Sequence, residues 1–248
     1  MKKLAVLGLM TLTAAVAQAD VLFDNGPVVN ANGKSVMGGT KAYRVNTYGV
    51  GDQSAFGYSV ADDFTVSSSS GWNVTDLDFF NYQTSAGAFT FTDVTWSIIS
   101  GTNPNSGSVV ASGTTAVTNG GLVGYRVAYP TLNNTDRAIY DLKADIPDVT
   151  LAAGSYWLTW SVSGTGSSGP WQPLTSDRRT GNFMQNLNDG NGYTMVNVAV
   201  RPGIVDRTAE APFVINGTVA AVPEPATWAS LAAGLGLLGF LRSRRRAD

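Results

Sequence analysis

Apolar and polar residues alternate with a period of two through the middle of this chain, and this pattern constrains its fold more than any other feature. Between residues 156 and 162, large apolar side chains occupy every second position. Related patterns occur in 94–98, 125–129, 193–200 and 213–219. Such alternation is typical of strands with one buried face, and no long stretch shows the 3.6-residue period of an amphipathic helix. The sequence therefore predicts an all-β fold.

Turn-forming residues separate these segments at regular intervals. They lie at 24–26, 67–71, 101–107, 119–121, 164–170 and 188–192. Strands spaced by roughly ten residues indicate a sandwich or barrel of antiparallel strands instead of alternating strands and helices. The alternation slips by one residue near Asp76 and again near Asp93, which predicts a β-bulge at each place. We expect a single antiparallel two-sheet sandwich over residues 20–222.

One segment has a familiar pattern. Leu151, Gly154, Tyr156 and Trp157 form a Leu-x-x-Gly-x-Tyr-Trp sequence at the start of an expected late strand. This resembles the corresponding segment of secreted jelly-roll and galactose-binding-like sandwiches. The resemblance is confined to this short stretch. It implies a jelly-roll-like architecture only and does not indicate a ligand.

Charge and composition exclude several classes of function. Residues 20–222 contain 10 basic and 16 acidic residues, so this part of the chain has a net charge of −6. An acidic surface repels a phosphate backbone, which argues against nucleic acid as a partner. The chain contains no Cys and no His, so disulfides, thiolate metal sites and catalysis that uses a Cys or His side chain of this chain are excluded.

The N-terminal 19 residues have the three parts of a secretory signal peptide. Lys2 and Lys3 are followed by the apolar stretch 4–16, and Ala17 and Ala19 supply the small side chains that signal peptidase requires. At about 1.5 Å per residue, a 13-residue helix is too short to cross roughly 30 Å of hydrocarbon. We therefore expect a signal helix that is cleaved after residue 19.

The C-terminal 26 residues combine a rigid motif, an apolar stretch and a basic end. Pro223, Glu224 and Pro225 cannot continue a helix or a central strand. Residues 226–241 carry no charge, and a helix of this length would be about 24 Å long, so it could cross the bilayer if the bilayer thins locally. A basic cluster follows and marks the cytoplasmic side. It comprises Arg242, Arg244, Arg245 and Arg246.

Together these features resemble the PEP-CTERM sorting signal. In that family a Pro-Glu-Pro motif precedes a short transmembrane helix and an arginine cluster at the C-terminus. The resemblance implies export, transient anchoring in the inner membrane and processing by an exosortase in a Gram-negative-type bacterium that makes exopolysaccharide. Residues 223–248 would then form a sorting tail, and Pro223, Glu224 and Pro225 would be a substrate motif. The alternative interpretation is an ordinary C-terminal membrane anchor.

Trp171 and Arg178 are the candidate ligand-binding residues of the middle region. Trp171 lies in a Gly/Ser/Pro-rich segment, where an exposed indole could stack on a sugar, and Asp177, Arg178 and Arg179 could form hydrogen bonds with hydroxyl groups. The alternative is that Trp171 folds back onto the sandwich and is buried, because apolar surface is stabilised by burial.

No metal site is expected from a complete ligand motif, and no cofactor is predicted. A structural calcium ion remains an alternative, because three segments offer several oxygen ligands. They are Asp62–Asp63, Asp76 with Asp78, and Asn186–Asn191. Local turns that Asp and Asn stabilise would explain the same residues without an ion.

Catalysis is not expected. Glycosidases use two carboxylates that flank one bond, and Glu210 is the only Glu between residues 20 and 222. The sequence favours a non-catalytic protein of the cell surface or extracellular matrix, with exosortase and signal peptidase as processing partners and exopolysaccharide as the expected ligand. A carbohydrate-active enzyme that uses Asp carboxylates and a structural scaffold without a ligand remain alternatives.

Overall fold

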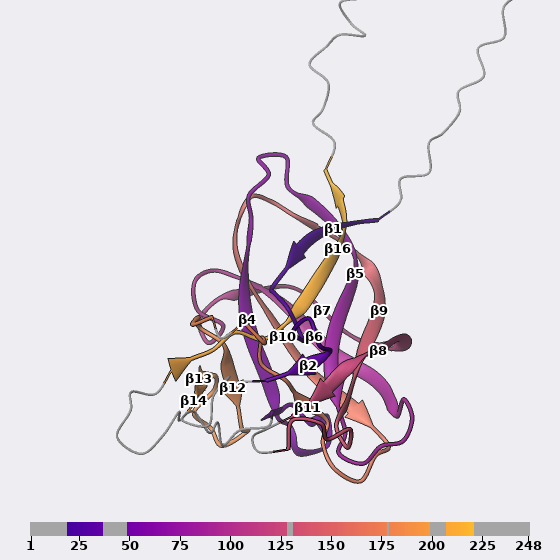
Figure 1. Cartoon of the computed structure of the whole chain (residues 1–248). Coiled ribbons are helices and arrows are strands. Elements are labelled where there is room, and N and C mark those ends of the chain that lie inside the picture. The colour runs from indigo at the N-terminus through magenta and orange to yellow at the C-terminus, as the bar shows by residue number, and fades with distance from the viewer. Residues whose placement is uncertain (1–18, 37–48, 128–130, 178, 199–206, 221–248) are drawn as a thin grey trace, which may run out of the picture.

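The computed structural model describes residues 19–36, 49–127, 131–177, 179–198 and 207–220. These residues form two β-sheets that pack face to face around one core (Figure 1). The all-β prediction and the two-sheet sandwich are confirmed. The predicted signal helix and the predicted C-terminal transmembrane helix lie outside the described residues.

The larger sheet has eight strands, six of which follow one another in the order β1-β16-β5-β9-β8-β2, while β11 pairs with β5 and with β3. Their bounds are β1 (Asp20–Asp24), β2 (Lys34–Ser35), β3 (Val50–Gly51), β5 (Trp72–Tyr82), β8 (Thr118–Arg126), β9 (Ala138–Leu151), β11 (Trp171–Gln172) and β16 (Phe213–Val219). All neighbours in this sheet are antiparallel except β2 and β8.

The second sheet has six strands in the order β13-β12-β4-β10-β6-β7. Their bounds are β4 (Ser59–Val66), β6 (Phe91–Ser100), β7 (Ser108–Ala116), β10 (Gly154–Gly164), β12 (Met184–Asn186) and β13 (Thr194–Met195). A separate two-stranded ribbon joins β14 (Asn197–Val198) to β15 (Arg207–Thr208). The expected strand over 193–200 is thus two short strands within the described range.

The only helix among the described residues is the single 3-10 turn η1 (Ser54–Phe56). No helix in that part of the chain is therefore long and apolar enough to cross a bilayer. The structure describes neither of the two apolar stretches near the chain ends.

The core lies between the sheets and uses the alternating residues of β10 as predicted. Tyr156, Leu158, Trp160 and Val162 all belong to the central hydrophobic cluster. Trp157 points to the opposite face, where it is buried with Ala61 and Ile99 in a smaller cluster.

Both predicted β-bulges are present. The pairing of β5 with β9 shifts between Val74 and Asp76, and the pairing of β10 with β6 shifts so that Gly164 pairs with Phe91 and Ser163 with Asp93. The segment 119–121 was predicted to be a turn, and this is wrong: it lies inside β8. Gly121, with φ of 120°, permits the irregular pairing of β8 at this point.

Arg126 shows a second departure from the pattern. The alternation of 125–129 places this side chain outward, but Arg126 is buried and donates a hydrogen bond from Nη1 to Ser35 Oγ at 3.0 Å. The hydroxyl belongs to β2, which pairs with β8, so a distant segment supplies the polar partner. Alternation within one strand contains no information about such a partner.

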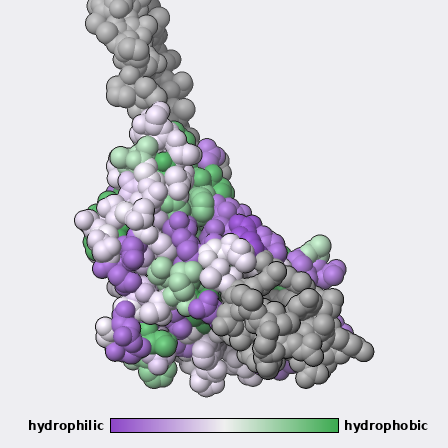
Figure 2. Space-filling model, turned by 90° about the vertical axis from the view of Figure 1, so that its left-hand side faces the viewer, coloured by the Kyte–Doolittle hydropathy of each residue, from purple (hydrophilic) through white to green (hydrophobic). Residues whose placement is uncertain are grey.

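Both ends of the described domain leave the sandwich at the same place. β1 pairs antiparallel with β16, so Asp20, where β1 begins, and Val219, where β16 ends, lie at the same end of the sheet (Figure 1). On the face that Figure 2 shows, hydrophobic and hydrophilic residues are interspersed over the area that the structure describes. The signal segment and the C-terminal segment are therefore attached to one end of the domain.

Candidate functional site: an aromatic pocket at the end opposite the chain termini

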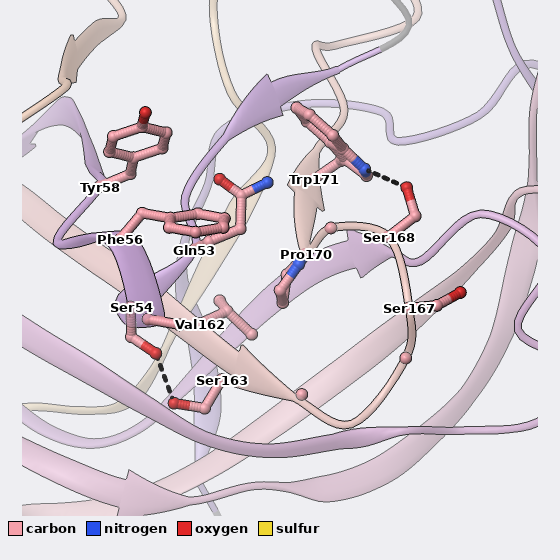
Figure 3. Close-up of a pocket in the computed structure, with 14 residues that line it drawn as sticks. Gln53, Ser54, Phe56, Tyr58, Val162, Ser163, Ser167, Ser168, Pro170 and Trp171 are labelled. Atoms are coloured by element: carbon pink, nitrogen blue, oxygen red, sulfur yellow. Dashed lines mark hydrogen bonds between the residues drawn. The ribbon is translucent and has the colours of Figure 1, made fainter.

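A pocket of about 630 Å³ opens between η1 and the segment that precedes β11 (Figure 3). Its lining combines aromatic rings, hydroxyl groups and one amide. The aromatic residues are Phe56, Tyr58 and Trp171, the hydroxyls belong to Ser54, Ser163, Ser167 and Ser168, and the amide belongs to Gln53. Flat apolar rings beside hydroxyl groups are suited to a ligand that has both apolar faces and hydrogen-bonding edges.

The pocket lies far from the end of the domain at which the C-terminal segment leaves. Strand β5 connects the two places: Trp72 pairs with Val219, the last residue of β16, and Tyr82 pairs with Trp171. Ten residues of strand at about 3.3 Å each separate these pairs, a distance of roughly 33 Å. The pocket thus lies at the opposite end of β5 from Val219.

A short turn forms one wall of the pocket. Backbone hydrogen bonds from Phe56 and Tyr58 to the carbonyl of Gln53, both of 3.1 Å, fold the turn η1. Gly57 ends it in the left-handed conformation, with φ of 71°. The left-handed conformation favours glycine here, and a Cβ atom at Gly57 would lie 2.7 Å from the side-chain amide nitrogen of Asn188, which would have to shift. Phe56 and Tyr58 consequently stand side by side, with ring centroids 5.6 Å apart.

The opposite wall is held by the buried side chain of Gln83. Its Oε1 accepts hydrogen bonds from Gly166 N at 3.2 Å and from Thr90 Oγ1 at 2.6 Å, and its Nε2 donates to Gly166 O at 3.2 Å. The oxygen and the nitrogen of this one amide therefore hold the segment after β10 beside the end of β5. This fixes the position of the wall in the absence of a ligand.

Trp171 is half-buried. It therefore has features of both interpretations of its sequence context, a ligand contact and a side chain packed onto the sandwich. Its ring packs against a small cluster that includes Phe80 and Tyr82, and its Nε1 donates to Ser168 Oγ at 3.3 Å. The same side chain also lines the pocket. Packing and the hydrogen bond hold the indole in one orientation, which prepares its remaining surface for a ligand.

A chain of hydroxyl groups leaves an acceptor free beside the pocket. Ser163 Oγ donates to Asp93 Oδ1 at 2.8 Å, so it accepts the proton of Ser54 Oγ, which lies 2.6 Å away. Ser54 then retains lone pairs that can accept a hydrogen bond from a ligand hydroxyl.

Two of the three charged residues predicted near Trp171, Asp177 and Arg179, do not line the pocket. Arg179 forms an ion pair with Asp177, with Nη2 and Oδ2 2.6 Å apart, and neither residue lines the pocket. Arg178, the other predicted contact, lies outside the described residues. The structure thus brings Trp171 together with residues that the sequence did not single out: Gln53, Ser54, Phe56 and Tyr58.

A second group of polar residues gathers around the middle of β4, outside the lining of the pocket. Among the described residues, one cluster has the spacing of metal ligands: Asp62, Asp63 and Glu210 each place a carboxylate oxygen within 4.8 Å of the others. The oxygens of Asp62 are already occupied. Oδ2 accepts from Asn25 Nδ2 at 3.0 Å and from Ala211 N at 2.7 Å, and Oδ1 accepts from Asp63 N at 3.0 Å.

This arrangement makes Asp62 a structural connection between three segments. Asn25 follows β1, and Ala211 precedes β16, so the carboxyl group of β4 holds both outer segments against the second sheet. Burial raises the pKa of Asp62 well above its ordinary value, and repulsion from Glu210 raises it further. The calcium ion considered for Asp62–Asp63 stays an untested alternative.

Polar groups of the protein already bind side chains in the other two candidate calcium segments. Lys143 Nζ lies 2.8 Å from Asp78 Oδ2, and Asp76 accepts a hydrogen bond from Thr75. In the segment Asn186–Asn191, Asn186 Oδ1 accepts from Asn188 N at 2.8 Å, which is the turn geometry that the sequence offered as the alternative.

A buried polar pair below the pocket was not foreseen from sequence. Asp52 is fully buried, and its Oδ2 accepts a hydrogen bond of 2.6 Å from Asn81 Nδ2. Asp52 Oδ1, Asn81 Oδ1 and Gln53 Oε1 are buried and accept no hydrogen bond within the described structure. Burial raises the pKa of Asp52 to about 7, although the hydrogen bond from Asn81 opposes this shift. No motif marks Asp52, because its environment arises from a strand about 30 residues further along the chain.

The fold and the pocket define an all-β sandwich protein with one aromatic pocket at the end remote from its termini. Residues 221–246 match the family model of the PEP-CTERM protein-sorting motif. The chain therefore carries a PEP-CTERM sorting signal, which makes it an exported, exosortase-targeted protein that passes through the membrane. No curated protein and no solved structure matches the chain, so the jelly-roll-like resemblance of residues 151–157 is not confirmed.

Proposed function

We propose that, after exosortase processing, the β-sandwich acts at the cell exterior as a non-catalytic protein that binds extracellular polysaccharide in the aromatic pocket. The observation that carries this proposal is the pocket itself, where Phe56, Tyr58 and Trp171 surround serine hydroxyls. Sugars present apolar C–H faces and hydroxyl edges, which such a lining complements. The sorting signal supports an extracellular destination for the domain.

The position of the pocket agrees with this role. The sorting tail leaves the domain beyond β16, roughly 33 Å of strand away from Trp171. While the tail is in the inner membrane, the pocket would point away from that membrane, into the periplasm. The protein could therefore engage polysaccharide before and after the tail is removed.

Replacing Phe56 by Ala tests the binding site without disturbing the core, because the Phe56 side chain is 64% exposed. An aromatic contact is worth about 0.5–1.5 kcal/mol, so we expect the Kd for the host's exopolysaccharide to rise roughly 2- to 12-fold. Affinity electrophoresis or calorimetry on the processed protein measures this change. Leu122→Ala removes a comparably exposed apolar side chain outside the pocket and should leave the Kd unchanged.

Trp171→Ala should weaken binding more strongly than Phe56→Ala, but it also removes packing against Phe80 and Tyr82. The comparison of the two variants separates loss of contact from loss of folding. Wild-type affinity in both variants would contradict the assignment of the pocket.

The sorting function has its own test. Glu224→Ala is expected to leave an unprocessed form in the membrane fraction, because the variant lacks the central residue of the Pro-Glu-Pro motif. Deletion of the exosortase should have the same effect. Intact mass of the extracellular wild-type protein should show that Arg242–Arg246 have been removed. Processing that is identical in the variant, the deletion strain and the wild type would refute exosortase cleavage at this tail.

The rival function is a carbohydrate-active enzyme that uses aspartate carboxylates. Asp62 and Glu210 lie close enough to be considered, but Asp62 is buried and neither residue lines the aromatic pocket. Release of reducing ends from polysaccharide by the purified wild-type protein, abolished by Asp62→Asn in a folded sample, would establish the rival and overturn the non-catalytic proposal.

A further inference from the structure

We propose that the aromatic pocket is one half of a longer groove, which holds consecutive sugar residues within an uncharged linear polysaccharide. This inference rests on the proposed function and specifies its ligand. It goes further in two respects: the ligand is a segment of chain, not a single sugar, and it is neutral. Each respect follows from a separate set of observations.

A second pocket of about 410 Å³ adjoins the first. Tyr58 and Trp171 line both pockets, so the two cavities meet at this pair of rings. In Figure 3, Tyr58 and Trp171 lie on either side of Gln53. A linear chain that extends from one pocket to the other must pass these rings, which can contact the sugar faces on either side.

The floor of the second pocket is part of the folded sheets. Trp171 of β11 pairs with Gly51 of β3, and Gln185 Nε2 of β12 donates to Gly51 O at 2.7 Å. This hydrogen bond joins the two sheets beneath the groove. The second pocket therefore has a fixed floor, as the first has a fixed wall.

The lining of the second pocket offers apolar surface to a sugar ring. Leu187 is 45% exposed and Met195 is 37% exposed, and both line this pocket. Thr194, Asn197 and Gln185 supply polar groups beside them. This is the same combination of apolar faces and hydrogen-bonding groups that the first pocket has.

Charge determines the class of polysaccharide. None of the residues that line either pocket is Asp, Glu, Lys or Arg. Residues 20–222 as a whole have a net charge of −6. A polyanionic chain would meet no cation among the described residues of the groove and would be repelled by the net charge of the domain, whereas a neutral chain incurs no such penalty. The groove is therefore matched to neutral sugars.

The test uses the host's exopolysaccharide after partial acid hydrolysis. Anion exchange separates neutral from acidic fragments, and size fractionation yields neutral fragments of one to six sugar units. Each fraction is titrated into the processed protein. We expect the affinity for neutral fragments to rise at least tenfold from one unit to three or four units and then to level off. Acidic fragments of equal length should bind more weakly.

Two variants assign the subsites. Leu187→Ser and Met195→Ser change exposed side chains of the second pocket and should preserve the fold. Each should abolish most of the gain from longer fragments while single-unit binding persists. Phe56→Ala, in the first pocket, should weaken all fragments.

The outcomes separate the two proposals. Equal affinity for one unit and for six units, wild-type length dependence in both Ser variants, or preference for acidic fragments would overturn the groove, while the glycan-binding function would stand. Binding of no fragment and no polysaccharide would refute the proposed function, and the groove with it.

Discussion

Replacing Asp52 by Asn is expected to stabilise the domain strongly at pH 8 and to change its stability little at pH 4. Burial raises the pKa of Asp52 from 3.8 to about 7 in the folded protein. Between these two values the folded state binds more protons than the unfolded state, so the free energy of unfolding falls as pH rises. The contribution of Asp52 is greatest below pH 3.8 and is lost as pH rises through about 7.

The size of the effect follows from the shift. At about 1.36 kcal/mol per pKa unit, ionisation of Asp52 at pH 8 costs roughly 4 kcal/mol of stability. Asn has nearly the same shape, cannot ionise, and can still accept the hydrogen bond from Asn81. For a domain of this size the melting temperature should rise by roughly 10 °C at pH 8.

The measurement is the melting temperature of the processed protein between pH 4 and pH 9. The matched control is Asp148→Asn, which makes the same charge change at an exposed position. Its curve should run close to that of the wild type. Parallel curves for Asp52→Asn and the wild type would show that Asp52 does not ionise with the cost expected from its burial.

Replacing Asp62 by Ala should destabilise the domain by about 1–3 kcal/mol. The substitution leaves Ala211 N–H without its acceptor and removes one acceptor of the Asn25 amide. Each buried donor left without a partner costs about 1–3 kcal/mol. Urea unfolding of the processed protein measures the loss.

Asp62→Asn should also be destabilising, in contrast to Asp52→Asn. Both oxygens of Asp62 accept from N–H groups, so an amide nitrogen at either position faces another donor. Hydrogen exchange should accelerate at β1 and at residues 210–213, which the carboxyl group connects. Asp63→Ala, on the same strand, provides the control. Unchanged stability of both Asp62 variants would mean that this group does not hold the outer strands.

Two features of the fold were predictable from local patterns. The core face of β10 follows from the alternation of Tyr156, Leu158, Trp160 and Val162, because consecutive side chains of a strand point to opposite faces. The bulges beside Asp76 and Asp93 follow from slips in that alternation. Strand β16 was predicted with the bounds that the structure shows.

Strands β4 and β7 escaped prediction for different reasons. Strand β4 carries Asp62 on its buried side, so a polar residue interrupts the alternation of apolar residues. The partners of Asp62 lie far away in the sequence, at Asn25 and Ala211. Strand β7 is largely exposed and pairs only at one edge, so burial imposes little pattern on it.

The candidate site was the least predictable part. Its residues come from η1, from the end of β10 and from the segment before β11, and only Trp171 had a local context that indicated a binding role. The pocket forms only where strand pairing and side-chain packing bring separate segments together. No single segment of the sequence therefore indicates it. The buried Asp52 was missed for the same reason.

By itself the sequence determined the C-terminal sorting signal, the all-β class and the absence of Cys and His chemistry, since each of these depends on residue types and on neighbours along the chain. Tertiary structure alone decided which end of the sandwich carries the pocket, which aspartates are buried and which rings face one another. Those properties depend on strand register and sheet packing, which join residues that lie far apart in the sequence.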